Sequence, residues 1–365
     1  MAKRKITTEE IKEASMPVEK AAKVPPTYLS SGSTLLNLLL SDKYDGGYET
    51  GGYVLAMGTS RSGKSLLTLQ ALAEAANSSV FDGYTLYHDD SERGASEGLK
   101  NLFGTKTEER INSPAYDENG LPQPSAQVEE FFFRIDDICD KGKPFIYVLD
   151  SFDSLTTDDE EGKFDDLKKA HRAGKQISGT YGLSKAKAFS TYMRKIVGPI
   201  RDTNSILFGI SQAKDNISFG YGEKYTRAGG TALRYYATCE IMVDIVEAIK
   251  KTVAGNPRHI GNRVKVTANK NRQTGSRGVI LISIYDSHGV DDLGDIIHYL
   301  TETENHWKKS GQKMIAPEFD FEGTPEKFIS MIEEQNREDE LKQLCQKVWL
   351  EIKDKSALGR KKKYE

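Results

Sequence analysis

Eight consecutive residues of the chain read Gly58-Thr59-Ser60-Arg61-Ser62-Gly63-Lys64-Ser65. They fit the pattern G-x-x-x-x-G-K-[ST], whose glycines let the backbone wrap around a phosphate while the loop N–H groups point at it. The apolar run Val54–Met57 precedes the pattern and an amphipathic stretch follows it, so a strand, a loop and a helix are expected in this order. We therefore predict a nucleotide-binding loop in which Lys64 reaches the β and γ phosphates and Ser65 ligates Mg²⁺.

A second apolar run, Phe145–Leu149, ends at Asp150. In a parallel sheet, ligands bind beyond the carboxyl ends of the strands. We therefore predict that Asp150 is the second protein group on Mg²⁺, and that Ser151 is a candidate for holding a metal-bound water. The alternative is an aspartate that only caps the following turn.

Hydrolysis of a nucleotide also needs a group that orients or deprotonates water. The run Thr85–His88 leads into three acids, Asp89, Asp90 and Glu92. Their chemistry alone does not select one of them, and solvated turn charge accounts for at least two. His88 is expected to pack or to cap rather than to bind a ligand.

Short apolar runs alternate with amphipathic stretches between residues 28 and 291, which predicts an α/β core with a mostly parallel central sheet flanked by helices. The late runs Glu240–Ile245, Arg263–Ala268 and Val279–Ile284 predict an antiparallel extension of that sheet. Residues 1–27 are expected to form a short helix and a linker, which either frays or docks on a neighbouring copy. Residues 292–365 are expected to form a small helical C-terminal domain with a basic tail.

Composition narrows the possible partners. Of the 365 residues, 37% are hydrophobic and 29% are charged, with a formal net charge of −3. The apolar runs are too short to span a bilayer. The scattered cysteines, Cys139, Cys239 and Cys345, fit neither a disulfide framework nor a zinc site, which favours a reducing, cytoplasmic setting. Because the net charge is slightly negative, a nucleic-acid partner would need a local basic surface.

Several segments make the chain resemble the RecA family, and most of all its phage UvsX-like branch. Asp90-Ser91-Glu92-Arg93-Gly94 resembles the family's D-[SA]-E segment, whose glutamate activates the hydrolytic water, and this implies that role for Glu92. Asp150-Ser151 is similar to the family's metal-site strand end, and Leu29–Asn37 to the entry of its core. The resemblance covers most of residues 28–290 and implies a RecA-type P-loop ATPase core.

Later segments add to this resemblance. Ile210-Ser211-Gln212 resembles the family's I-N-Q, which implies that Gln212 senses the γ-phosphate and signals to the adjoining DNA-binding loop. Gly229–Ala237 is similar to G-G-x-A-L-x-[FY]-Y-A. The family's basic pair that contacts ATP across the protomer interface is K-x-K or K-x-R. Here it is either Lys270 with Arg272, or Lys270 alone with Ala268 in the other place.

Two segments are candidates for DNA contacts. The loop after Gln212 mixes cations with aromatic rings, as single-strand binding requires, and the resemblance implies that it inserts between bases. Its candidate residues are Lys214, Phe219, Tyr221, Lys224, Tyr225, Arg227, Gly229 and Gly230. The segment Lys163–Lys185 matches the family's first DNA loop in position, and its candidates are Lys168, Lys169, Arg172 and Lys175. An ordinary surface loop or a charged excursion is the alternative for each.

The resemblance implies an ATP-dependent DNA recombinase. It would form a filament on single-stranded DNA, pair that strand with homologous duplex DNA, and hydrolyse ATP with Mg²⁺ under DNA stimulation. Its partners would be DNA, further copies of the chain, and single-strand-binding and mediator proteins, with no membrane. Two alternatives remain: a hexameric DNA helicase motor, for which residues 1–27 are a short assembly segment, and a RecA-like mediator or paralogue without strand exchange.

Overall fold

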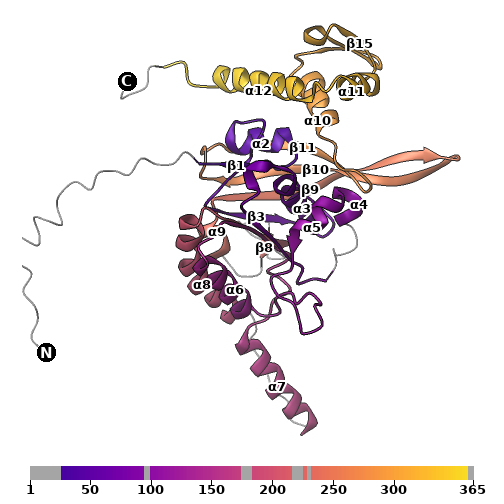
Figure 1. Cartoon of the computed structure of the whole chain (residues 1–365). Coiled ribbons are helices and arrows are strands. Elements are labelled where there is room, and N and C mark those ends of the chain that lie inside the picture. The colour runs from indigo at the N-terminus through magenta and orange to yellow at the C-terminus, as the bar shows by residue number, and fades with distance from the viewer. Residues whose placement is uncertain (1–25, 94–98, 174–182, 216–224, 228–231, 361–365) are drawn as a thin grey trace, which may run out of the picture.

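The computed structural model describes residues 26–93, 99–173, 183–215, 225–227 and 232–360. Within them a 10-stranded central sheet has the order β12-β11-β10-β9-β3-β7-β6-β4-β5, and β8 pairs with β7 off this path (Figure 1). The strands are β3 (Gly52–Gly58), β4 (Thr85–Asp89), β5 (Ile111–Asn112), β6 (Phe145–Leu149), β7 (Ile206–Asp215), β8 (Tyr225–Arg227), β9 (Cys239–Val253), β10 (Asn256–Asn271), β11 (Val279–Tyr285) and β12 (Gly289–Val290).

The sheet has a parallel half and an antiparallel half. From β9 through β3, β7, β6 and β4 to β5, every neighbouring pair runs parallel. From β9 to β10, β11 and β12, the pairs are antiparallel. The predicted α/β architecture, with its antiparallel extension, is therefore confirmed. Strands β9 and β10 extend well past the predicted runs Glu240–Ile245 and Arg263–Ala268.

Two hydrophobic clusters cover the two faces of the sheet, as the pleat of β3 illustrates. Val54 and Ala56 belong to one cluster, while Tyr53, Leu55 and Met57 belong to the other, because successive side chains on a strand point to opposite faces. The first face is covered by α2 (Thr34–Ser41) and α3 (Lys64–Asn77), and the second by α6 (Val128–Asp140), α8 (Leu183–Asp202) and α9 (Ala232–Tyr236). Each β3 residue is buried, so the strand before the glycine loop is a rigid support.

The C-terminal region is less purely helical than predicted. Helices α10 (Asp292–His298), α11 (Pro325–Glu334) and α12 (Glu338–Lys355) are joined by a three-stranded antiparallel sheet of β13 (Lys308–Ser310), β14 (Lys313–Ala316) and β15 (Phe321–Gly323). Trp307, Phe319 and Phe328 pack edge to face beside this sheet. The strands are short and their apolar residues few, which explains why their pattern gave no strand prediction. The boundary at residue 292 coincides with the start of α10, but the hydrophobic cluster continues across it.

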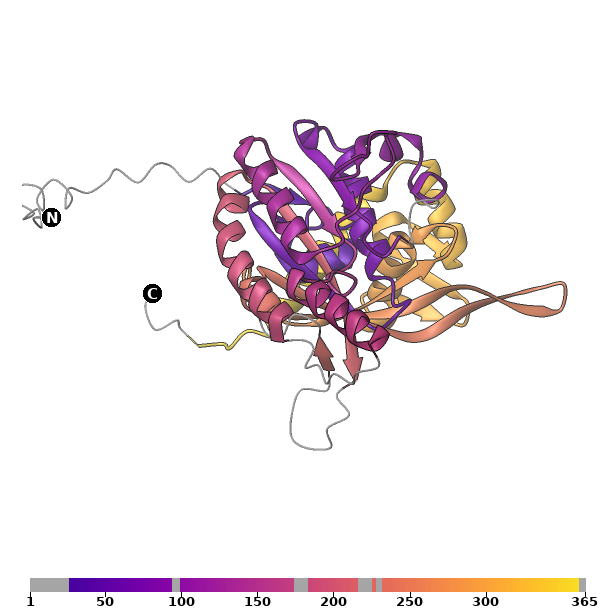
Figure 2. The same ribbon diagram turned by 90° about the horizontal axis from the view of Figure 1, so that it is seen from below.

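Two elements project from the body. Helix α7 (Asp158–Arg172) begins before the segment Lys163–Lys185, which was predicted as a loop, and covers the first part of it (Figure 1). None of the residues of α7 is buried. Thr157 and Glu160 form a capping box, and acids in the first turn and bases in the last complement the helix dipole, which accounts for a helix here. The outer parts of β9 and β10 form a two-stranded ribbon that extends away from the sheet (Figure 2).

The remaining elements are short. Strands β1 (Tyr28–Leu29) and β2 (Tyr48–Glu49) form a separate pair. Helices α4 (Leu99–Phe103) and α5 (Thr105–Arg110), the 3₁₀ turns η1 (Ser79–Phe81) and η3 (Pro317–Phe319) and the π-helical turn η2 (Tyr299–Thr303) complete the described residues. The predicted N-terminal helix lies outside the described residues. Among the described helices, none combines the length and apolarity that crossing a bilayer requires.

Candidate functional site

The glycine loop connects β3 to α3, as predicted. At Gly58 a Cβ atom would lie 2.2 Å from the carbonyl oxygen of Val243, so a side chain cannot be accommodated there. Gly63 is the N-cap residue of α3 with a φ of 94°, and its Cβ would lie 2.6 Å from Cδ1 of Ile284. Both glycines are therefore needed for the loop to keep this path. The N-terminus of the 14-residue helix α3 points its free N–H groups into the loop, which favours an anion.

Lys64 lies at the centre of this loop. Its Nζ donates a hydrogen bond to the carbonyl oxygen of Thr59 at 2.6 Å, and the residue is only 7% exposed. Burial lowers the pKa of Lys64, and the nearby carboxylates of Asp150, Glu92 and Asp153 oppose this shift. Lys64 is therefore a buried cation close to several acids. Its Nζ can donate to a phosphate oxygen in place of the Thr59 carbonyl oxygen.

Asp150 follows β6 and Ser65 follows the glycine loop after β3, so both lie at the carboxyl ends of the parallel strands. The Ser65 hydroxyl lies close enough to the buried Asp150 carboxylate to lower its pKa. Burial raises the pKa of Asp150 to about 6, and the carboxylates of Glu92 and Asp90 add to this rise, while Ser65 and Lys64 oppose it. A hydroxyl and one carboxylate side by side fit Mg²⁺, because this ion usually takes one or two protein groups and keeps water and phosphate for the rest.

Glu92 follows β4, whose strand end lies beside that of β6. The Ser151 hydroxyl donates to Oε1 of Glu92, and the Gln212 amide Nε2 lies 3.4 Å from the same oxygen. The Ser91 hydroxyl donates to the carbonyl oxygen of Asp150 at 2.9 Å, which ties the two strand ends together. Five candidate residues thus meet at the carboxyl ends of the parallel strands: Lys64, Ser65, Asp150, Glu92 and Gln212.

Asp89 is excluded from this group by its surroundings. It is fully buried and accepts hydrogen bonds from the Ser125 N–H at 2.7 Å, the Ser125 hydroxyl at 2.6 Å and the Tyr147 hydroxyl at 2.6 Å. His88 is also buried, and this burial lowers its pKa. Both residues therefore belong to the packing of β4, as expected for His88.

Lys270, on β10, and Arg272, just after it, lie back from the glycine loop toward the amino end of β3. Lys270 pairs with Glu240 on β9, and Glu240 pairs with Leu55 on β3. Leu55 is three residues before Gly58, so Lys270 is about 10 Å short of the loop along the strand direction. The structure does not bring these two cations to the glycine loop of their own chain.

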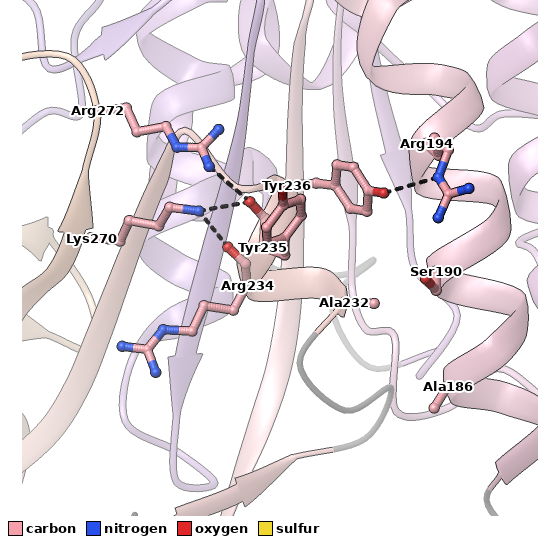
Figure 3. Close-up of a pocket in the computed structure, with 9 residues that line it drawn as sticks. All are labelled: Ala186, Ser190, Arg194, Ala232, Arg234, Tyr235, Tyr236, Lys270 and Arg272. Atoms are coloured by element: carbon pink, nitrogen blue, oxygen red, sulfur yellow. Dashed lines mark hydrogen bonds between the residues drawn. The ribbon is translucent and has the colours of Figure 1, made fainter.

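A cavity of about 870 Å³ opens beside Lys270 and Arg272 (Figure 3). Lys270 Nζ donates to the carbonyl oxygens of Arg234 at 2.6 Å and Tyr235 at 2.8 Å, and Arg272 donates to the Tyr235 carbonyl at 3.1 Å. Burial and the neighbouring Arg272 lower the pKa of Lys270 to about 8. With Arg194 on the far wall, the cavity presents several cations and is suited to an anion.

The candidate DNA residues are described only in part. Lys168, Lys169 and Arg172 are exposed on α7. Lys214 is in β7, and Tyr225 and Arg227 are in β8, which pairs antiparallel with β7. The others lie outside the described residues: Lys175, Phe219, Tyr221, Lys224, Gly229 and Gly230.

Sequence reasoning missed two residues at these sites. Asp153 lies near Lys64 and accepts a hydrogen bond from the Gln212 N–H. An acid in the otherwise apolar or small segment after Asp150 was the signal that could have revealed it. Arg194 is a cation on α8, and nothing in the sequence around it indicates that it faces a cavity.

Comparisons with known proteins agree with this geometry. Residues 1–291 match the family model of the RecA N-terminal domain. Protein RecA of Lactococcus lactis subsp. cremoris (strain MG1363) is 27% identical over 297 residues, which cover 81% of this chain and 69% of that protein. Protein RecA of Lactiplantibacillus pentosus is 29% identical over 301 residues, which cover 82% of this chain and 70% of that protein.

Proposed function

This chain belongs to the RecA family, and on that premise we propose that it is a DNA-dependent ATPase that forms a filament on single-stranded DNA and promotes pairing and strand exchange with a homologous duplex. Family membership assigns it to the ATP- and DNA-binding proteins of recombination and repair. Strand exchange, a cytoplasmic location and kinship with the phage UvsX-like branch are parts of the proposal. The division into residues 1–27, 28–291 and 292–365 is proposed with them.

Each candidate residue at the carboxyl ends of the parallel strands has a proposed role. The loop Gly58–Ser65 binds the phosphates of ATP through its N–H groups, and Lys64 neutralises the β and γ phosphates. Ser65 and Asp150 would hold Mg²⁺, which offsets phosphate charge when bound. Glu92, held by the Ser151 hydroxyl, orients and deprotonates the attacking water.

The observation that carries the proposal is the path of β7. Gln212 touches Glu92 at 3.4 Å, and the same strand continues through Lys214 to Asp215, where it pairs with β8. A change at the γ-phosphate that moves Gln212 therefore acts on a strand that enters the candidate DNA loop. This connection supports a switch in which ATP favours the DNA-binding state and hydrolysis releases it.

Lys270 and Arg272 are proposed to act on a neighbouring protomer. They lie away from the glycine loop of their own chain, and they line a cationic cavity set back from that loop toward the amino end of β3. In a head-to-tail assembly, opposite ends of adjacent copies meet, so this cavity would face the ATP held by the next copy.

The test combines two assays on the purified full chain. We expect ATP hydrolysis to rise when single-stranded DNA is added, and displacement loops to form with ATP between a labelled strand and a homologous supercoiled duplex. A non-hydrolysable ATP analogue should still support pairing, since binding rather than hydrolysis favours the active state. ATPase stimulation without displacement loops would favour the mediator or the helicase, and no stimulation by DNA would contradict the proposal.

A further inference from the structure

Asp153 connects the two strand ends at the candidate ATP site. It lies three residues after Asp150, and its Oδ2 accepts a hydrogen bond from the Gln212 N–H at 2.7 Å. The preceding residue, Phe152, donates its N–H to the carbonyl oxygen of Ile210 at 2.9 Å. The segment after β6 is therefore fastened to β7 by a backbone bond and then by a side-chain bond.

The carboxylate takes over where backbone pairing ends. The last paired residues of β6 and β7 are Leu149 and Gly209. The ring of Phe152 then lies against Gly209, where a Cβ would come within 2.1 Å of it. Beyond this contact the Asp153 side chain supplies the acceptor that a neighbouring strand would otherwise give to Gln212.

Two further contacts make this position a junction. Asp153 is one of the carboxylates close enough to Lys64 to counter the effect of burial on its pKa. Lys185, at the start of α8, donates from Nζ to the backbone carbonyl oxygens of Asp153, at 3.1 Å, and Leu155. Asp153 thus lies between three parts of the molecule: Lys64, strand β7 with Gln212, and helix α8, which begins at the end of the first candidate DNA segment.

The second carboxylate oxygen is also informative. Oδ1 of Asp153 is buried and makes no hydrogen bond to any described residue. One oxygen of this carboxylate accepts from the Gln212 N–H, and the other is shielded from water. Because electrostatic interactions are strong where water is excluded, small movements of Lys64 or Gln212 change the energy of this carboxylate.

We infer that Asp153 is a positioning residue that couples DNA contact to ATP hydrolysis by holding the backbone of Gln212 against the segment that carries Asp150. It touches neither phosphate nor water in this role and acts through Gln212. The inference rests on the proposed function, because coupling has meaning only if DNA stimulates the ATPase.

The test compares three variants of the full chain with the wild type. Asp153→Ala removes the acceptor, Asp153→Asn keeps a carbonyl oxygen that can accept from Gln212, and Asp137→Ala removes an exposed carboxylate on α6 as the matched control. For each protein, kcat and KM for ATP are measured without DNA and with saturating single-stranded DNA. Thermal unfolding shows whether each variant is folded.

In Asp153→Ala, we expect the ratio of kcat with DNA to kcat without DNA to fall at least about tenfold, because the Gln212 N–H is left without its acceptor. Both Asp153 variants also remove a carboxylate beside Lys64. A change in the DNA-independent kcat or in the KM for ATP should therefore be the same in the two, while the ratio of kcat with DNA to kcat without DNA separates them. Asp153→Asn should recover most of the stimulation, and Asp137→Ala should match the wild type.

Three outcomes would overturn the inference while leaving the proposed function intact. The first is full DNA stimulation in Asp153→Ala, and the second is an equal loss with and without DNA. The third is an Asn variant as defective as the Ala variant, which would assign the effect to charge beside Lys64. Failure of the wild type itself to respond to DNA would instead contradict the proposed function.

Discussion

Asp89, Asp90 and Glu92 follow one another within four residues, yet their surroundings differ. Asp89 is sealed inside the protein and accepts three hydrogen bonds, from Ser125 and Tyr147. Glu92 lies at the carboxyl ends of the parallel strands, where Ser151 and Gln212 contact it. From the residue types alone these acids were equivalent, since burial is decided by Ser125 and Tyr147, which are distant in the chain.

Because of this difference in surroundings, two similar substitutions should impair different properties: catalysis for Glu92 and stability for Asp89. Glu92→Gln should lower the kcat for ATP about 10²- to 10⁴-fold, the usual contribution of a general base, with little change in melting temperature. Asp89→Asn should instead lower stability by about 1–3 kcal/mol, because its amide group cannot accept from all three donors. Steady-state ATPase assays and urea unfolding of both variants measure this. A stable Asp89→Asn protein with no turnover would contradict the assignment.

At the scale of elements, periodicity predicted what lies in the core. The strands ending at Asp150 and before Gly58 were found from apolar runs alone, since buried parallel strands carry little else. Helix α7 was missed because it buries nothing, so it has no apolar stripe, and only its cap and its charge order indicate a helix. The roles of Gln212 and Glu92 were implied by resemblance, whereas the contact between them and the bond from Gln212 to Asp153 depend on how the strand ends meet.

Helix α10 carries a pH-sensitive contact with the sheet. The Asp295 carboxylate accepts from the Ser283 N–H on β11 at 2.8 and 3.1 Å, yet burial raises its pKa from 3.8 to about 8, with Asp291 and Asp292 adding to the rise. Between these two pKa values the folded state keeps a proton that the unfolded state has lost. Stability should therefore fall as the pH rises from about 4 to about 8.

Replacing this carboxylate should remove its share of the pH dependence. We expect the free energy of unfolding of Asp295→Asn, relative to the wild type, to improve steadily between pH 5 and pH 8. Urea unfolding at several pH values measures the difference. A parallel pH profile for the two proteins would show that Asp295 does not titrate in this range.

For the whole molecule, the proposed function divides the ATP site between neighbouring copies. The glycine loop lies at the carboxyl end of β3, and Lys270 and Arg272 lie back from it, beside the cationic cavity. Under this proposal a single copy carries both parts of the site without joining them. Catalysis would depend on contact between copies.

A mixing experiment tests this division. Lys64→Ala and Lys270→Ala should each be nearly inactive alone in DNA-stimulated ATP hydrolysis. In an equimolar mixture, some interfaces join the intact loop of one variant to the intact Lys270 of the other, so activity should exceed the sum of the separate proteins. If Lys270 acted on the ATP of its own chain, mixing would restore nothing.

The ribbon of β9 and β10 has a consequence for handling the protein. Beyond Val243 on one side and before Gly261 on the other, its two strands pair only with each other within the described residues, and Ile245, Val246 and Val253 are exposed. Such bare strand edges can pair with the same edges of another copy and seed aggregates. Here Lys251 lies opposite Arg258, with Lys250 beside it, so two approaching ribbons bring like charges together. Concentrated salt, whose screening length is about 3 Å at 1 M, removes that repulsion. Moderate ionic strength should therefore keep the protein dispersed for longer than high salt does.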